Sequence, residues 1–93
     1  MIDNSKKYRP INRLLVANRG EIAVRIIRTA KEMGITTIGV ITKAEPYTVA
    51  DEYILLEGDT LSETYLNVEA IVKAAQTKKA DAIHPGYGFL SEN

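Results

Sequence analysis

The amino-acid sequence predicts an α/β fold, a small three-layer Rossmann-like domain with a mostly parallel sheet. Short apolar runs without polar alternation, such as residues 14–17, are typical of strands that are covered on both faces. These runs alternate with longer segments whose apolar residues follow the helical period, such as residues 21–33. With 93 residues and no cysteine, the chain is long enough for one domain and cannot rely on disulfides.

The first strand is expected over residues 11–17, and a tight turn follows at residues 18–20. A helix should then run from Glu21 to about Met33, with Gly34 placed to end it in a left-handed conformation. The apolar side chains of this segment fall within one arc at about 100° per residue. They are Ile22, Ala23, Ile26, Ile27, Ala30 and Met33. We expect this face to pack on the sheet.

The opposite face of this helix carries a charged ridge, formed by Glu21, Arg25, Arg28 and Glu32. The spacing allows ion pairs from Glu21 to Arg25 and from Arg28 to Glu32, each worth about a few tenths of a kcal/mol. From spacing alone, a solvated surface is the simpler interpretation of the ridge. A contact with another domain or subunit is the alternative.

The second half of the chain is expected to complete the sheet. Further strands are predicted at residues 36–41, 53–56 and 81–84. A loop at residues 42–50 separates the first two of these, and Asn67 should cap a helix over residues 68–78. The expected buried stripe of that helix comprises Val68, Ile71, Val72 and Ala75. The resulting order is β-α-β-β-α-β with right-handed crossovers.

Composition excludes several classes of partner. Twelve basic and twelve acidic residues cancel, so we expect no nucleic-acid partner. No apolar run approaches the ~18 residues that a membrane span needs, so we expect no membrane partner. One histidine and no cysteine argue against a metal site. Residues 1–10 are polar and lack the apolar core of a signal peptide, which predicts a flexible cytoplasmic N-terminus.

The turn at residues 18–21 lies where a Rossmann domain places its phosphate loop. Only Gly20 is present where that motif has three glycines, and no acidic residue ends the second strand. An autonomous nucleotide-binding domain is therefore a poor interpretation. We expect a tight turn in which Arg19 is tied to neighbouring structure.

The final segment, residues 84–93, follows the last predicted strand and is rich in glycine. His84 could be a general base or a ligand, although a hydrogen-bonded structural role is favoured. The glycines around Tyr87 suit either a close approach to a ligand or a sharp turn with positive φ. Glu92 could reach into a site, with helix capping favoured. The chain holds no complete set of nucleophile, base and orienting group.

Two long motifs resemble the N-terminal domain of biotin carboxylase. They are LLVANRGEIA at residues 14–23 and AIHPGYGFLSEN at residues 82–93, with shorter matches at residues 50–52 and 62–67. The resemblance implies a pre-ATP-grasp domain over residues 11–93, cut before an ATP-grasp domain. The parent enzyme would be an ATP-dependent biotin carboxylase, a ligase that carboxylates biotin with bicarbonate. Such a ligase serves acetyl-CoA, propionyl-CoA, methylcrotonyl-CoA or pyruvate carboxylases.

The resemblance also implies cofactors and partners. The parent would use ATP, Mg²⁺ or Mn²⁺ and biotin, and we expect none of them to bind this chain alone, so the isolated chain should be inactive. The implied partners are the ATP-grasp and C-terminal domains of the enzyme, a biotin carrier domain and, as one option, a second copy in a homodimer. The expected location is the cytoplasm, or the mitochondrial matrix in a eukaryote.

By the resemblance, Tyr87 and Gly88 correspond to the loop beside the biotin ureido ring and bicarbonate, and Glu92 lies close to that site. Arg25, Arg28 and Glu32 match the helix that bacterial members use in their dimer contact. The resemblance therefore favours an interface role for the charged ridge. A non-catalytic α/β module that binds a partner through the ridge is the alternative function.

The chain departs from the family pattern at one place in particular. The stretch between the second strand and Ala50 is shorter than usual and lacks a histidine that the family carries there. Residues 56–61 also lack the usual Gly-Pro pair. These differences put the local loop structure in doubt and leave both long motifs intact.

Overall fold

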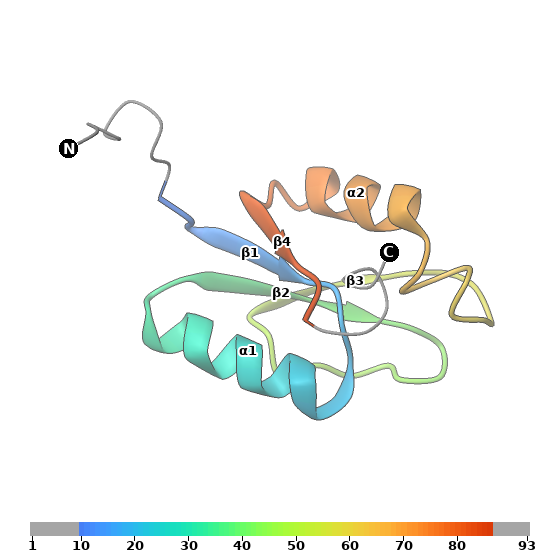
Figure 1. The fold of residues 1–93 in the computed structure, drawn as a ribbon, viewed down its shortest axis with the longest axis horizontal. Helices are drawn as coiled ribbons and strands as arrows, with labels where there is room; N and C mark the ends of the chain where they lie inside the picture. The colour runs from blue at the N-terminus through green and yellow to red at the C-terminus, as the bar shows by residue number, and fades with distance from the viewer. Residues whose placement is uncertain (1–9, 87–93) are drawn as a thin grey trace.

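The computed structural model describes residues 10–86 as one four-stranded sheet with two helices. The elements are β1 (Arg13–Val16), α1 (Gly20–Glu32), β2 (Thr36–Ile41), β3 (Glu52–Leu55), α2 (Val68–Thr77) and β4 (Ala82–His84) (Figure 1). The strand order is β3-β2-β1-β4, and every neighbouring pair is parallel. The predicted α/β fold with a mostly parallel sheet is confirmed. The expectations for residues 1–9 and for Tyr87, Gly88 and Glu92 lie outside the described residues.

Helix α1 covers one face of the sheet and α2 covers the other, which gives three layers (Figure 1). On the α2 side, the core joins Leu15 and Ile38 of the sheet to Ile71 of the helix. On the α1 side, Val16 meets Ile27. Strand β1 is thus buried on both faces, which explains why its sequence shows no polar alternation.

No helix covers the crossover from β2 to β3, which is made by a loop at residues 42–51. This loop lies on the α1 side of the sheet, since Lys31 of α1 donates to the carbonyl oxygen of Val49 at 2.8 Å. Its end is held by Asp51, whose Oδ2 accepts the backbone N–H of Thr37 at 2.8 Å. That hydrogen bond is the main reason why the pKa of Asp51 lies below its ordinary value. A loop that is anchored at several points therefore makes this crossover.

The predicted helix ends are largely correct. Asn67 caps α2, because its Oδ1 accepts the backbone N–H of Ala70 at 3.1 Å. Gly34 follows the last residues of α1 with φ of 79°, as expected for a glycine that ends a helix. Helix α1 begins at Gly20, one residue earlier than expected, and β1 is shorter than residues 11–17. Shifts of this size are usual at element ends.

Three side chains that were expected to be buried are exposed, and these expectations were wrong. Met33 is 70% exposed, because it lies at the C-cap where the helical period stops. Val68 and Val72 are 54% and 41% exposed. Helix α2 rests on Ile71 together with the small residues Ala74 and Ala75. Val72 lies about 100° around the helix from Ile71, so it points along the sheet surface rather than into it.

Arg13 ties together three elements at the amino-terminal edge of the sheet. Its Nη1 and Nη2 donate to the two carboxylate oxygens of Glu52 on β3, each at 2.8 Å. Its Nε and Nη2 also donate to the carbonyl oxygen of Lys78 after α2, at 3.0 and 2.7 Å. The Arg13 hydrogen bond lowers the pKa of Glu52, an effect partly offset by desolvation. This network was not foreseen from the sequence.

Candidate functional site

The order of the strands defines where a ligand site belongs in this fold. The chain builds outward from β1 through β2 to β3, and then returns to place β4 on the other side of β1. In open parallel sheets, ligands bind outside the carboxyl ends of the strands where the order reverses. The candidate site therefore lies at the carboxyl ends of β1 and β4, which are joined where Ala17 N donates to His84 O at 2.9 Å.

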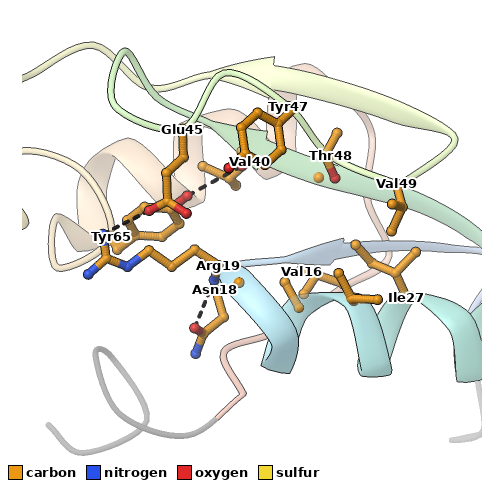
Figure 2. Close-up of a pocket in the computed structure, with 14 residues that line it drawn as sticks. Val16, Asn18, Arg19, Ile27, Val40, Glu45, Tyr47, Thr48, Val49 and Tyr65 are labelled. Atoms are coloured by element: carbon orange, nitrogen blue, oxygen red, sulfur yellow. Dashed lines mark hydrogen bonds and ion pairs between the residues drawn. The ribbon is translucent and has the colours of Figure 1, made fainter.

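Asn18, which follows β1, links the two strand ends at this point. Its side chain is buried, with the residue only 3% exposed. Its Nδ2 donates to the carbonyl oxygen of Pro85 at 2.7 Å. Its Oδ1 accepts the backbone N–H of Arg19 at 2.8 Å (Figure 2). Asn18 thus connects the turn after β1 with the turn after β4.

Gly86 sits against this asparagine in a conformation that favours glycine. Its φ is 68°, and a Cβ added there would lie 2.6 Å from Asn18 Nδ2 and 3.0 Å from Ile22 Cγ2. Of the two alternatives for this segment, the sharp turn with positive φ is the one found at Gly86. The backbone N–H of Gly86 donates to Nδ1 of His84 at 3.0 Å, which supports the hydrogen-bonded structural role favoured for His84.

An open groove of about 620 Å³ runs from this turn along α1. It is lined by Glu21, Ile22, Arg25, Ile26, His84 and Gly86. The structure therefore brings Arg25 of the charged ridge beside the turn after β4. Arg28 and Glu32 lie about one and two helical turns further along α1 and do not line the groove.

The ion pairs expected within the charged ridge do not form. Glu21, Arg25, Arg28 and Glu32 are all exposed. Among the ion pairs of residues 10–86, none joins Glu21 to Arg25 or Arg28 to Glu32. Holding two long exposed side chains in one geometry costs entropy that a surface pair barely offsets. The ridge thus presents its charges outward, which suits either solvent or a contact.

Arg19 is tied to neighbouring structure, as predicted. Its Nη1 lies 2.8 Å from Oε1 of Glu45, and its guanidinium lies 5.9 Å from the centre of the Tyr65 ring. These residues close one end of a cavity of about 200 Å³ between α1 and the loop at residues 42–51 (Figure 2). Val16, Ile27 and Val49 form its apolar end. Because Glu45 offsets the charge of Arg19, this turn is a poor cradle for phosphate.

Tyr65 is a large buried side chain at this cavity, at 2% exposed. Its hydroxyl donates to the carbonyl oxygen of Val40 at 3.4 Å. Burial raises the pKa of Tyr65 to about 12, with the Glu45 charge adding to the rise and Arg19 opposing it. The phenol therefore stays protonated at neutral pH, and Tyr65 serves packing rather than proton transfer.

Within residues 10–86, no group of three or more histidine, aspartate and glutamate side chains is placed to hold a metal ion. None of the helices in that range has the length and apolar character needed to cross a bilayer. Asn18 is the site residue that sequence reasoning missed. Its signal was a polar residue placed directly after a fully apolar strand and before a glycine turn.

The fold defines the class of the protein: an α/β domain with a parallel sheet between two helices, whose candidate ligand site lies at the carboxyl ends of β1 and β4. Residues 10–93 match the family model described as "Biotin carboxylase, N-terminal domain". The chain belongs to this family, and the resemblance drawn from its two long motifs is confirmed.

The relatives are much longer proteins. Biotin carboxylase 2 of Bacillus subtilis (strain 168) is 54% identical over 85 residues, covering 87% of this chain and 19% of its own length. The mitochondrial propionyl-CoA carboxylase alpha chain of Homo sapiens is 48% identical, covering 88% of this chain and 12% of its own. The crystal structure of the Kluyveromyces lactis urea carboxylase matches with a TM-score of 0.86 and 49% identity, over 89% of this chain and 8% of that one. The chain thus corresponds to a small part of multidomain carboxylases.

Proposed function

We propose that residues 11–93 serve as the N-terminal domain of an ATP-dependent biotin carboxylase and complete its pocket for biotin and bicarbonate. The parent reaction would convert ATP, bicarbonate and a biotin carrier to carboxybiotin. One observation carries the proposal: the turn at Pro85 and Gly86 is locked onto Asn18 at the carboxyl ends of β1 and β4. The chain continues from that turn directly into Tyr87 and Gly88, the residues proposed to lie beside biotin and bicarbonate, with Glu92 close by.

We propose that the residues that bind ATP and its metal lie in other domains of the parent enzyme. The described residues contain no metal-binding group of carboxylates, and Arg19 of the turn after β1 is paired with Glu45. The family resemblance is what supports placing ATP, with Mg²⁺ or Mn²⁺, in those other domains. We expect the chain to act only together with the ATP-grasp and C-terminal domains and the biotin carrier, and to be inactive alone.

The proposal is tested by replacing Tyr87 with alanine in the intact carboxylase. Biotin carboxylation should fall, because the residue is proposed to line the biotin pocket, while the melting temperature should be unchanged. Tyr47→Ala is the matched control, because Tyr47 lies in the loop at residues 42–51 and is 76% exposed. Full turnover in the Tyr87 variant would exclude the pocket role.

A second role concerns the charged ridge of α1. We propose that Arg25, Arg28 and Glu32 contact another subunit or a partner protein, either in a homodimer of the parent enzyme or in a non-catalytic interaction module. The support is that these exposed charges are not paired with one another along the helix. Arg28→Glu should weaken association measured by light scattering. Lys73→Glu, a charge reversal on the exposed side of α2, should not. Equal association of both variants would remove the interface proposal.

The location remains a proposal as well. We infer the cytoplasm, or the mitochondrial matrix in a eukaryote, since the relatives include proteins named as mitochondrial carboxylase chains. Cell fractionation with an antibody to the chain would test this.

A further inference from the structure

We propose that Asn18 is a positioning residue for the biotin and bicarbonate site. It would hold the turn after β4 in place, so that the chain enters Tyr87 and Gly88 from a fixed point. This inference rests on the proposed function, because it assigns Asn18 a role in the same pocket.

The first support is the pair of hydrogen bonds that the Asn18 side chain makes. Nδ2 donates to the Pro85 carbonyl oxygen at 2.7 Å, and Oδ1 accepts the Arg19 N–H at 2.8 Å. One partner is an acceptor and the other a donor, so the amide has a single favourable orientation. The pairing joins residues 67 positions apart in the chain, so it fixes tertiary structure rather than a local turn.

The second support is the packing of Gly86 on the same side chain. A Cβ at Gly86 would lie 2.6 Å from Asn18 Nδ2 and 3.2 Å from Asn18 Cγ, so backbone and amide are in close contact. Asn18 therefore fixes the turn in two ways, through a hydrogen bond to Pro85 and through contact with Gly86.

The third support is the rigidity of the platform that carries Asn18. It follows Val16 and Ala17, both 0% exposed, on a strand with a hydrogen-bonded neighbour on each side. Functional groups are positioned best when their supporting residues are locked by packing of this kind. By contrast, β4 is a three-residue strand with one partner in the described part of the chain, so its end needs an outside anchor.

The test uses Asn18→Asp in the intact carboxylase. This exchange keeps the size of the side chain and the acceptor for the Arg19 N–H. It places a carboxylate oxygen against the Pro85 carbonyl oxygen, so the hydrogen bond that holds the turn should be lost. We expect kcat for biotin carboxylation to fall about 10- to 100-fold, the cost typical of a small misplacement in a catalytic site. The KM for ATP should stay unchanged, and hydrogen exchange should rise only in the peptide that spans residues 82–93. A general loss of structure would instead raise exchange throughout and alter both kinetic constants.

Asn67→Asp is the matched control, because aspartate is an equally good helix cap and Asn67 lies at the start of α2, outside the site. It should leave kcat and exchange at residues 82–93 unchanged. If Asn18→Asp does not fold, Gly86→Ala is used in its place. The alanine Cβ would push the turn away from an intact Asn18. This variant should produce the same selective loss of kcat.

The two proposals fail in different ways. If Tyr87→Ala lowers turnover while Asn18→Asp, or Gly86→Ala in its place, retains normal kcat, Asn18 is not a positioning residue although the pocket role stands. If Tyr87→Ala has no effect, the pocket role itself is wrong, and the inference about Asn18 is overturned with it.

Discussion

Replacing Gly39 with alanine should detach the loop at residues 42–51 from the sheet. A Cβ at Gly39 would lie 2.8 Å from Cβ and 2.9 Å from Cγ2 of Thr48, and closer still to Oγ1, whereas ordinary contacts begin at 3.4 Å. The loop would have to retreat by roughly half an ångström or more, against its anchors at Lys31 and Asp51. Overpacking of this kind typically costs about 1–3 kcal/mol. That is a sizeable share of the ~5–14 kcal/mol expected for a domain of this size.

A double-mutant cycle with Thr48→Gly separates this clash from other effects. Thr48→Gly removes the three atoms nearest to the new Cβ, so the double variant should recover most of the loss as a coupling energy of about 1–2 kcal/mol. The assay is urea unfolding followed by circular dichroism. Gly34→Ala is the control: its Cβ would meet nothing within 4 Å, so its cost comes from the positive φ of 79° and should add to that of Thr48→Gly without coupling. Additive effects of Gly39→Ala and Thr48→Gly would refute the described contact.

Two further predictions concern stability. Asn67→Ala should lower the free energy of unfolding by about 1 kcal/mol, measured by urea titration, because it removes the cap on Ala70 N–H; no change would mean that the cap is not formed in solution. Glu52→Gln should flatten the acid dependence of stability. Arg13 lowers the pKa of Glu52 in the folded state. The ionised Glu52 therefore stabilises the fold above its ordinary pKa of 4.5, and this stabilisation is lost as the pH falls through the lower pKa of the folded state. The difference in melting temperature between about pH 5 and about pH 3 should therefore be smaller for the variant than for the wild type. Parallel acid dependence in both proteins would argue against the Arg13–Glu52 pair.

Much of the secondary structure was predictable because it depends on local pattern. The uninterrupted apolar run at residues 14–17 indicated a strand buried on both faces, and β1 has this environment. The helix ends at Asn67 and Gly34 were predictable, because a helix cap and a positive φ each depend on the type of one residue. Gly86 was foreseen as a turn residue for the same reason.

The errors arose where neighbours in space decide the outcome. Periodicity placed Val68 and Val72 on an apolar arc, but the small side chains of Ala74 and Ala75 set which side of α2 approaches the sheet. Lys31 was not singled out from the sequence, yet it donates to the loop at Val49. A helical repeat shows which residues share a face, and it cannot show what that face meets.

The sequence by itself determined the family, the α/β class and the positions of the two glycine-containing turns, because motifs, periodicity and backbone demands are carried by residues close together in the chain. Only the tertiary structure decided the strand order, the loop packed on Gly39, the Arg13–Glu52 pair and the bond from Asn18 to Pro85. The last two contacts join residues 39 and 67 positions apart. Such pairings depend on how the elements pack, and no local pattern encodes them.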